Sequence, residues 1–244
     1  MAAMSSSSSG LRDIGAATAG ENKNNNKNSA EVVPWSDRIT GSIARSRKVR
    51  GGNYVQIATV DESGHPRCRT VVFRGFLPVE ERGGAQAFKM ITDARSEKVS
   101  HVSKQSNKCE LCWWFSASSE QYRVAGTLEL VGLTHASSEL VAHRKQQWGN
   151  LSDNAREQFF WEGQPGKSFD EGATQPPTGG RDAEGKLLPP PDAFLLLLLW
   201  PQQVKYLRLT DNFSQVDNLA ESSSVKAEGD ASSSDAWEAV RVNP

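Results

Sequence analysis

Apolar and polar positions alternate along the middle of the chain and predict strands. Residues 54–60 (YVQIATV) alternate, DESGHP supplies turn formers, and residues 68–76 (CRTVVFRGF) are again β-prone, so a hairpin is expected. Further strands are predicted at residues 87–92, 109–115, 120–133, 194–200 and 204–209, with Pro201 between the last two. A strand at residues 237–242 (WEAVRV) should close the sheet.

Helical spacing indicates a few helices between these strands. Residues 36–49 place Ile39 and Ile43 on one face, and a short helix carrying Val99 and Val102 is expected after a cap at Asp93 or Ser96. Two more helices are predicted at residues 137–148 and 152–160. The order of elements predicts a mainly β fold, an antiparallel meander closing into a barrel or sandwich with inserted helices.

Polar, low-complexity stretches divide the chain. Residues 1–32 are predicted to be a disordered N-terminal segment, residues 162–191 a surface excursion, and residues 213–236 a low-complexity insertion. One domain is therefore expected over residues 33–212, with a final strand within residues 237–244.

Charge and cysteine content narrow the class of protein. The formal net charge of −1 argues against a nucleic-acid or membrane-surface partner. The sequence contains no run of 18 apolar residues, so no membrane span is expected. Three cysteines suit a reducing compartment, so a cytoplasmic location is expected, with a plastid or other organelle as the alternative from the Ser-rich N-terminus. Cys109 and Cys112 fall on opposite faces of a predicted strand, so no metal site is expected.

An arginine-rich strand carries the candidate chemistry. Strand alternation puts Arg69 on a face that is apolar further along, with Val71 and Phe73, and puts Arg74 on the other face. Either this is a solvated edge strand, or its arginines face an anion held inside the fold. Thr92 at a strand end and Lys98 in the first turn of a helix suit a phosphate, which favours the second interpretation.

This order of residues resembles the pyridoxamine 5′-phosphate oxidase-like, FMN-binding split-barrel family, in particular the branch described as the Alr4036-type FMN-binding domain. The stretches that carry the resemblance are YVQIATVDESGHPRCRTVVFRGF, FKMITDARSEKV, CWWFSASSEQYRVAGTLELVG, RKQQWGNLSDNAREQFFW and PPDAFLLLLLWPQQVKYLRL. They cover most of residues 33–212. The resemblance implies an FMN-binding split barrel that assembles as a homodimer with FMN at the subunit interface.

The resemblance also implies roles for individual residues. Arg69 would pair with the FMN phosphate, helped by Thr92 and Lys98, and Gln121 would reach the flavin from the partner subunit. The cofactor-binding strand comprises Arg69, Thr70, Val71, Val72, Phe73 and Arg74. Arg74, Arg123 and Arg208 are the candidates for the substrate side, and no catalytic residue is assigned.

Two departures from the family pattern leave the activity open. Glu97 stands where the family usually has a second arginine, and the Arg-x-His segment of the authentic oxidases is missing. The resemblance implies an oxidoreductase that passes hydride from pyridoxamine or pyridoxine 5′-phosphate to FMN, with reoxidation by dioxygen, in pyridoxal phosphate biosynthesis. The alternatives are an FMN-dependent reductase of another substrate and a non-catalytic flavin-binding module.

Overall fold

The computed structural model describes residues 32–163, 165–168, 171, 174–220 and 237–244. The segment predicted as disordered thus lies outside the described residues except for its last position, and so do residues 221–236 of the predicted insertion. None of the helices within the described ranges has the length and apolar character needed to cross a membrane.

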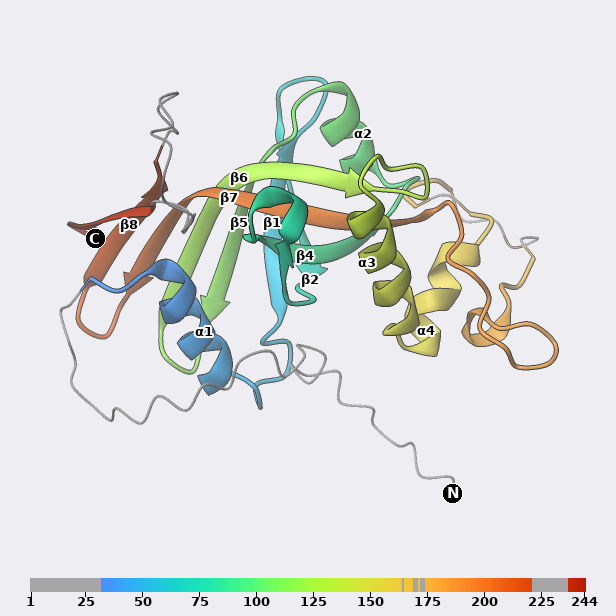
Figure 1. The fold of residues 1–244 in the computed structure, drawn as a ribbon, viewed down its shortest axis with the longest axis horizontal. Coiled ribbons are helices and arrows are strands. Elements are labelled where there is room, and N and C mark those ends of the chain that lie inside the picture. Colours follow the sequence, from blue (N-terminus) through green and yellow to red (C-terminus); the bar gives the residue numbers. More distant parts are fainter. Residues whose placement is uncertain (1–31, 164, 169–170, 172–173, 221–236) are drawn as a thin grey trace.

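An antiparallel sheet forms the body of the described chain (Figure 1). Its strands run in the order β2-β1-β5-β6-β7-β4-β3, with β8 beside β7 and β9 beside β8. Their bounds are β1 Tyr54–Val60, β2 Pro66–Val72, β3 Phe76–Val79, β4 Ala85–Asp93, β5 Lys108–Phe115, β6 Glu120–Val131, β7 Phe194–Arg208, β8 Phe213–Leu219 and β9 Trp237–Val242. The predicted mainly β fold is therefore confirmed.

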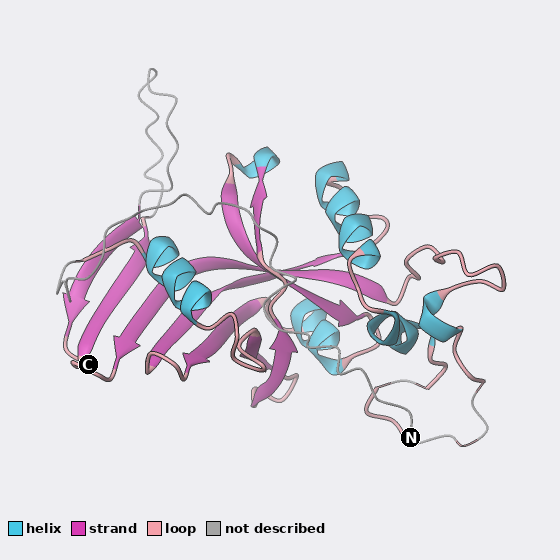
Figure 2. Cartoon of the chain, turned by 90° about the horizontal axis from the view of Figure 1, so that it is seen from below, coloured by secondary structure: helices cyan, strands magenta, loops and turns pink. Residues whose placement is uncertain are grey.

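Helices lie around this sheet. They are α1 Trp35–Arg45, α2 Glu97–Lys104, α3 Ser138–Gly149 and α4 Asp153–Glu157, with short 3₁₀ turns η2 Glu80–Arg82, η3 Gln158–Phe160 and η4 Thr178–Gly180. Figures 1 and 2 show α3 and α4 at the end of the molecule opposite β8 and β9. Helix α1 packs near β8, where the Trp35 amide donates to Asp217 Oδ1 at 3.2 Å.

The predicted hairpin is present, and the residues that follow its second strand bond to β4 and close the barrel. Strand β1 pairs with β2 so that Ile57 lies opposite Arg69. Beyond β2, the amide of Arg74 donates to the Lys89 carbonyl at 2.8 Å, and the Lys89 amide donates to the Gly75 carbonyl at 2.9 Å. Gly75 adopts φ 107°, a region that favours glycine, so the chain can turn here and bond to β4.

Two predictions about the last strands are wrong. Strand β9 pairs with β8 and extends an edge of the sheet, so residues 237–242 do not close it. Residues 213–219, assigned to the low-complexity insertion, form β8, because its polar side chains are satisfied by one another: Gln215 Nε2 donates to Asp217 Oδ2 at 2.9 Å, and both residues are fully buried. The strand predicted over residues 68–76 also ends earlier than expected: β2 ends at Val72, and a separate strand, β3, begins at Phe76.

The two strands predicted on either side of Pro201 are one continuous strand, β7. Its first half pairs with β4 and its second half with β8, while β6 pairs with both halves. The register shifts between Ala125 and Gly126, and this bulge places Pro201 opposite Gly126. A Cβ on Gly126 would lie 1.9 Å from the Trp200 carbonyl oxygen, so only glycine allows this approach.

Replacing Gly126 by alanine should therefore strongly destabilise the fold. Backbone atoms, which cannot move aside as a side chain can, face the added methyl group. We expect Gly126→Ala to lower the free energy of unfolding by about 3 kcal/mol or more, measured by urea unfolding. Gly149→Ala, at a position with open space around it, should change it by less than about 0.5 kcal/mol; an equal loss in both variants would contradict the assignment.

Candidate functional site

Arg69 is the cation that β2 turns toward the barrel. It lies on the same strand face as Val71, which packs against the main core, and the Arg69 side chain is half-buried. Its Nη1 donates to the Thr59 hydroxyl oxygen at 2.7 Å. The core anchors the end of this strand, since the buried Phe73 ring has its centroid 4.7 Å from that of Trp113. The predicted division of the strand into faces is thus confirmed.

A second cation, Lys98, comes from the first turn of α2. Its Nζ donates to the hydroxyl oxygens of Thr92 at 3.1 Å and Ser96 at 3.0 Å. Thr92 is buried near the end of β4, and Ser96 is the residue before the first turn of α2. We call Arg69, Thr92, Ser96 and Lys98 the cationic cradle.

The Arg69 guanidinium is close enough to Lys98 to affect its pKa. Burial lowers the pKa of Lys98 and Arg69 lowers it further, while Asp93 and Glu97 act in the opposite direction; burial likewise lowers the pKa of Arg69. Among the residues that the structure describes, neither cation forms an ion pair with a carboxylate. The nearby Asp93 is held by Arg95, and Glu97 is exposed. Two half-buried cations that lie near each other suit an anion such as a phosphate monoester.

The structure brings together Arg69, Thr92 and Lys98 as predicted, and it adds residues that the sequence did not single out. Thr59 and His101 are buried and share a hydrogen bond of 2.9 Å between Oγ1 and Nδ1. A signal for Thr59 was present, because it is a polar residue on the inward, otherwise apolar face of β1. No comparable signal marked His101.

Other predicted residues of the cofactor strand lie along its length. Thr70 is exposed, Val71 and Val72 are half-buried, and Arg74 is half-buried where the barrel closes. Burial lowers the pKa of Lys89, and Arg74 lowers it further, so a second pair of cations meets at this closure.

The remaining candidates are not brought together with the cradle. Gln121 lies on the outward face of β6, opposite the exposed Trp114 on β5. Arg123 forms an exposed two-point ion pair with Glu110, at 2.7 and 3.1 Å. Arg208 pairs with Asp211 through Nε and Nη2, at 2.8 and 2.7 Å.

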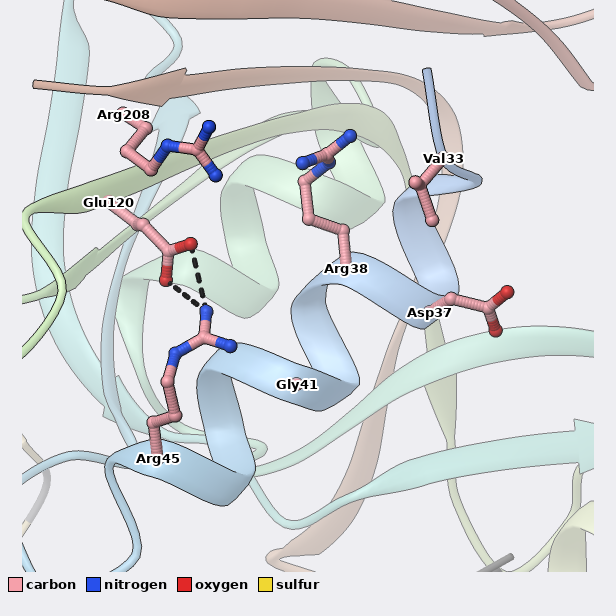
Figure 3. Close-up of a pocket in the computed structure, with 7 residues that line it drawn as sticks. All are labelled: Val33, Asp37, Arg38, Gly41, Arg45, Glu120 and Arg208. Carbon is pink, nitrogen blue, oxygen red and sulfur yellow. Dashed lines mark hydrogen bonds and ion pairs between the residues drawn. The ribbon is translucent and has the colours of Figure 1, made fainter. Parts of the chain in front are cut away.

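Arg208 instead lines a separate hollow of about 210 Å³ beside α1 (Figure 3). The other lining residues are Val33, Asp37, Arg38, Gly41, Arg45 and Glu120. Figure 3 shows Arg45 reaching Glu120 while Asp37 points away from both. None of the cradle residues lines this hollow.

Glu120 is the buried centre of a hydrogen-bond network at this hollow. Burial raises its pKa, but hydrogen bonds from the hydroxyls of Ser118, Ser42 and Tyr206 and from Arg45 outweigh burial, so the pKa lies below its usual range. The Tyr206 hydroxyl donates to Oε1 at 2.7 Å, and Arg45 Nη2 donates to Oε2 at 2.8 Å. The network ties the start of β6 to α1 and β7.

Comparison with known proteins identifies the family. A family model described as "Pyridoxamine 5'-phosphate oxidase, FMN-binding domain" matches residues 32–132. A curated relative from Arabidopsis thaliana, pyridoxine/pyridoxamine 5′-phosphate oxidase 2, is 30% identical over 220 residues, covering 87% of this chain and 98% of that protein. The chain belongs to the pyridoxamine 5′-phosphate oxidase FMN-binding family.

Solved structures agree with the fold of this family. A pyridoxamine 5′-phosphate oxidase-related, FMN-binding protein from Nostoc punctiforme superposes with a TM-score of 0.68 at 32% identity, covering 88% of this chain and 100% of that one. PhzG from Burkholderia lata has a TM-score of 0.59 at 14% identity, with coverages of 86% and 91%, and shows the fold alone. The split-barrel fold class and the resemblance are confirmed.

FMN is the cofactor of this family, and the cradle fits it. The phosphate of FMN is nearly a dianion, and Arg69 and Lys98 are two cations with no ion-pair partner among the described residues. Within those same residues, no group of His, Cys, Asp and Glu side chains is arranged to hold a metal ion.

The Glu120 network predicts a pH-dependent contribution to stability. Because the pKa of Glu120 is lower in the folded chain than its ordinary value of 4.5, its ionisation stabilises the fold above that pH and loses this effect as pH falls through the lowered pKa. Glu120→Gln should lower the free energy of unfolding by about 2 kcal/mol at neutral pH, and by much less once the pH has fallen through the lowered pKa of Glu120, measured by urea unfolding.

The half-buried Glu110, on the strand that neighbours Glu120, offers the control for this variant. Glu110→Gln should cost less than about 1 kcal/mol at either pH, because its pair with Arg123 is solvated. A loss in Glu120→Gln that stays the same at both pH values would contradict the role of its charge.

Proposed function

We propose that this protein is an FMN-dependent oxidoreductase of the pyridoxamine/pyridoxine 5′-phosphate oxidase type, acting in pyridoxal phosphate biosynthesis. The observation that carries the proposal is the cationic cradle, in which two half-buried cations meet with no carboxylate paired to either among the described residues. The full-length similarity to the Arabidopsis oxidase supports the same activity.

The cofactor strand and α2 would hold FMN. Arg69 would pair with the phosphate, while Lys98 and the Thr92 hydroxyl would complete its contacts. Backbone groups of Val71 and Val72 would border the isoalloxazine ring. Thr70 and Phe73 belong to the same strand, and the buried Phe73 would keep it in place through its packing on Trp113.

The substrate side would be served first by Arg74. Burial lowers the pKa of the neighbouring Lys89, and Arg74 lowers it further, so two basic side chains lie near each other at this end of the strand. Arg123 and Arg208 are further candidates, and each would have to leave its present carboxylate, on Glu110 or Asp211, to bind a substrate. When bound, FMN supplies the hydride-accepting ring, which dioxygen returns to its oxidised form.

A homodimer would complete the site. Trp114 and Tyr54 are large aromatic side chains, 44% and 45% exposed, on the neighbouring strands β5 and β1. Gln121 lies opposite Trp114 on the same outward face. An exposed aromatic surface of this kind suits contact with a second copy, and would let the partner subunit's Gln121 reach the FMN held by the cradle.

The phosphate assignment predicts that Arg69→Ala weakens FMN binding selectively. Loss of a charged pair should cost about 2 to 3 kcal/mol of binding free energy for FMN and little for riboflavin, which lacks the phosphate. Both affinities are measured by quenching of flavin fluorescence. Arg67→Ala is the matched control, because Arg67 lies on the same strand but is exposed and paired with Asp61. Unchanged FMN affinity in Arg69→Ala would contradict the assignment of Arg69 to the FMN phosphate.

The activity assignment predicts product formation by the FMN-loaded protein. Pyridoxamine or pyridoxine 5′-phosphate should yield pyridoxal 5′-phosphate together with hydrogen peroxide, followed by absorbance and a peroxide assay. Faster flavin reduction by NAD(P)H than by pyridoxine 5′-phosphate in stopped flow would assign the protein to the reductases instead. Tight FMN binding with no turnover of either would leave a flavin-binding module.

A further inference from the structure

We propose that His101, acting through Thr59, is a positioning residue that fixes the Arg69 guanidinium for the phosphate of FMN. The inference rests on the proposed function, because it concerns the group that Arg69 would bind. It adds two residues to the site, neither of which would touch the ligand.

A chain of hydrogen bonds links the three side chains. Arg69 Nη1 donates to Thr59 Oγ1 at 2.7 Å, and Thr59 Oγ1 lies 2.9 Å from His101 Nδ1. Thr59 is 1% exposed and His101 is 7% exposed, so water has little access to replace either bond. The Arg69 guanidinium is a charged donor, and hydrogen bonds from charged donors are stronger than those between neutral groups.

Each hydrogen bond between Arg69, Thr59 and His101 can be assigned a donor and an acceptor. A guanidinium only donates, so the Thr59 oxygen accepts from Arg69. The hydroxyl keeps one proton of its own, and we assign this proton to the bond with His101 Nδ1, the other partner of Thr59 Oγ1. His101 would therefore be a neutral imidazole with its proton on Nε2. In this state it orients the Thr59 hydroxyl, whose lone pair in turn holds the guanidinium.

The hydrogen bond between Thr59 and His101 also sets the spacing between the two cations of the cradle. His101 lies three residues after Lys98, so the two project from the same side of α2. Arg69 belongs to the β1–β2 hairpin, and the Thr59–His101 bond fastens that hairpin to α2. A second tie lies further out, where Gln105 Nε2 donates to the Glu62 carbonyl at 3.1 Å. Fixing the helix against the hairpin holds Lys98 and Arg69 at a set separation.

A purely structural role for Thr59 and His101 predicts something different. If they only stabilised the fold, their loss would affect binding of any flavin equally. If they position Arg69, their loss affects the phosphate contact and spares the ring. The ratio of the dissociation constants for riboflavin and FMN separates the two roles.

We expect Thr59→Val, in the full chain at slightly alkaline pH, to raise the dissociation constant for FMN about tenfold and that for riboflavin less than about twofold. Thr59→Ser, which keeps the hydroxyl, should restore most of the FMN affinity. His101→Leu should weaken FMN binding about threefold, and His101→Asn should restore it, because its amide oxygen can accept near the position of Nδ1. Adding His101→Leu to Thr59→Val should cause no further loss.

Two controls and two contrary outcomes make the test decisive. Thr40→Val on α1, whose hydroxyl donates to the Ser36 carbonyl, and His143→Leu on α3, whose ring lies beside Glu139, should leave the ratio unchanged. If Arg69→Ala weakens FMN binding but Thr59→Val and His101→Leu leave the ratio unchanged, the inference alone fails. If Arg69→Ala also leaves it unchanged, the phosphate assignment fails with it. Should Thr59→Val not fold, His101→Leu and its asparagine rescue decide.

Discussion

The repulsion between two half-buried cations is the constraint on which the site depends. Arg69 and Lys98 each lose hydration on folding, and Lys98 is further disfavoured by the charge of Arg69. A chain with 29 acidic residues has ample means to neutralise them, yet the nearest aspartate, Asp93, is bound by Arg95. Asp93 and Glu97 offset part of this effect on Lys98 without forming an ion pair with it, so a bound anion would stabilise both cations further.

Rigid connections on each side of the cradle make this arrangement possible. Backbone bonds between Arg74 and Lys89 close the barrel beyond the cofactor strand, and the buried Phe73 fixes the same strand from within. On the far side, the glycine at position 126 lets β7 pass close to β6 and continue through a bulge, so one strand serves both ends of the sheet. Like charges repel, and the backbone bonds at Arg74 and Lys89 limit how far the strand that carries Arg69 can move from the strand that carries Thr92.

Local patterns predicted what depends on neighbouring residues and missed what depends on distant ones. Alternation over residues 54–60 predicted the hairpin and placed Arg69 on the same strand face as Val71, because strand faces repeat every second residue, but it left open whether Arg69 is solvated. Strand β8 was missed because buried Gln215 and Asp217 read as surface residues until each is seen to satisfy the other. Pro201 predicted a break between two strands because the residue that accommodates it, Gly126, lies 75 residues away in the sequence.

The arginines of one short segment show that position decides function more than residue type does. Arg67 points to solvent and is neutralised by Asp61 within its own hairpin, so it has no reason to bind a ligand. Arg69 is on the same side of β2, two residues closer to the core, and is half-buried beside a second cation. Arg74 lies on the opposite face at the closure, beside Lys89. Because the same side chain serves as a surface ion pair in one place and an anion ligand in another, counting arginines cannot identify such a site; their burial and their charged neighbours can.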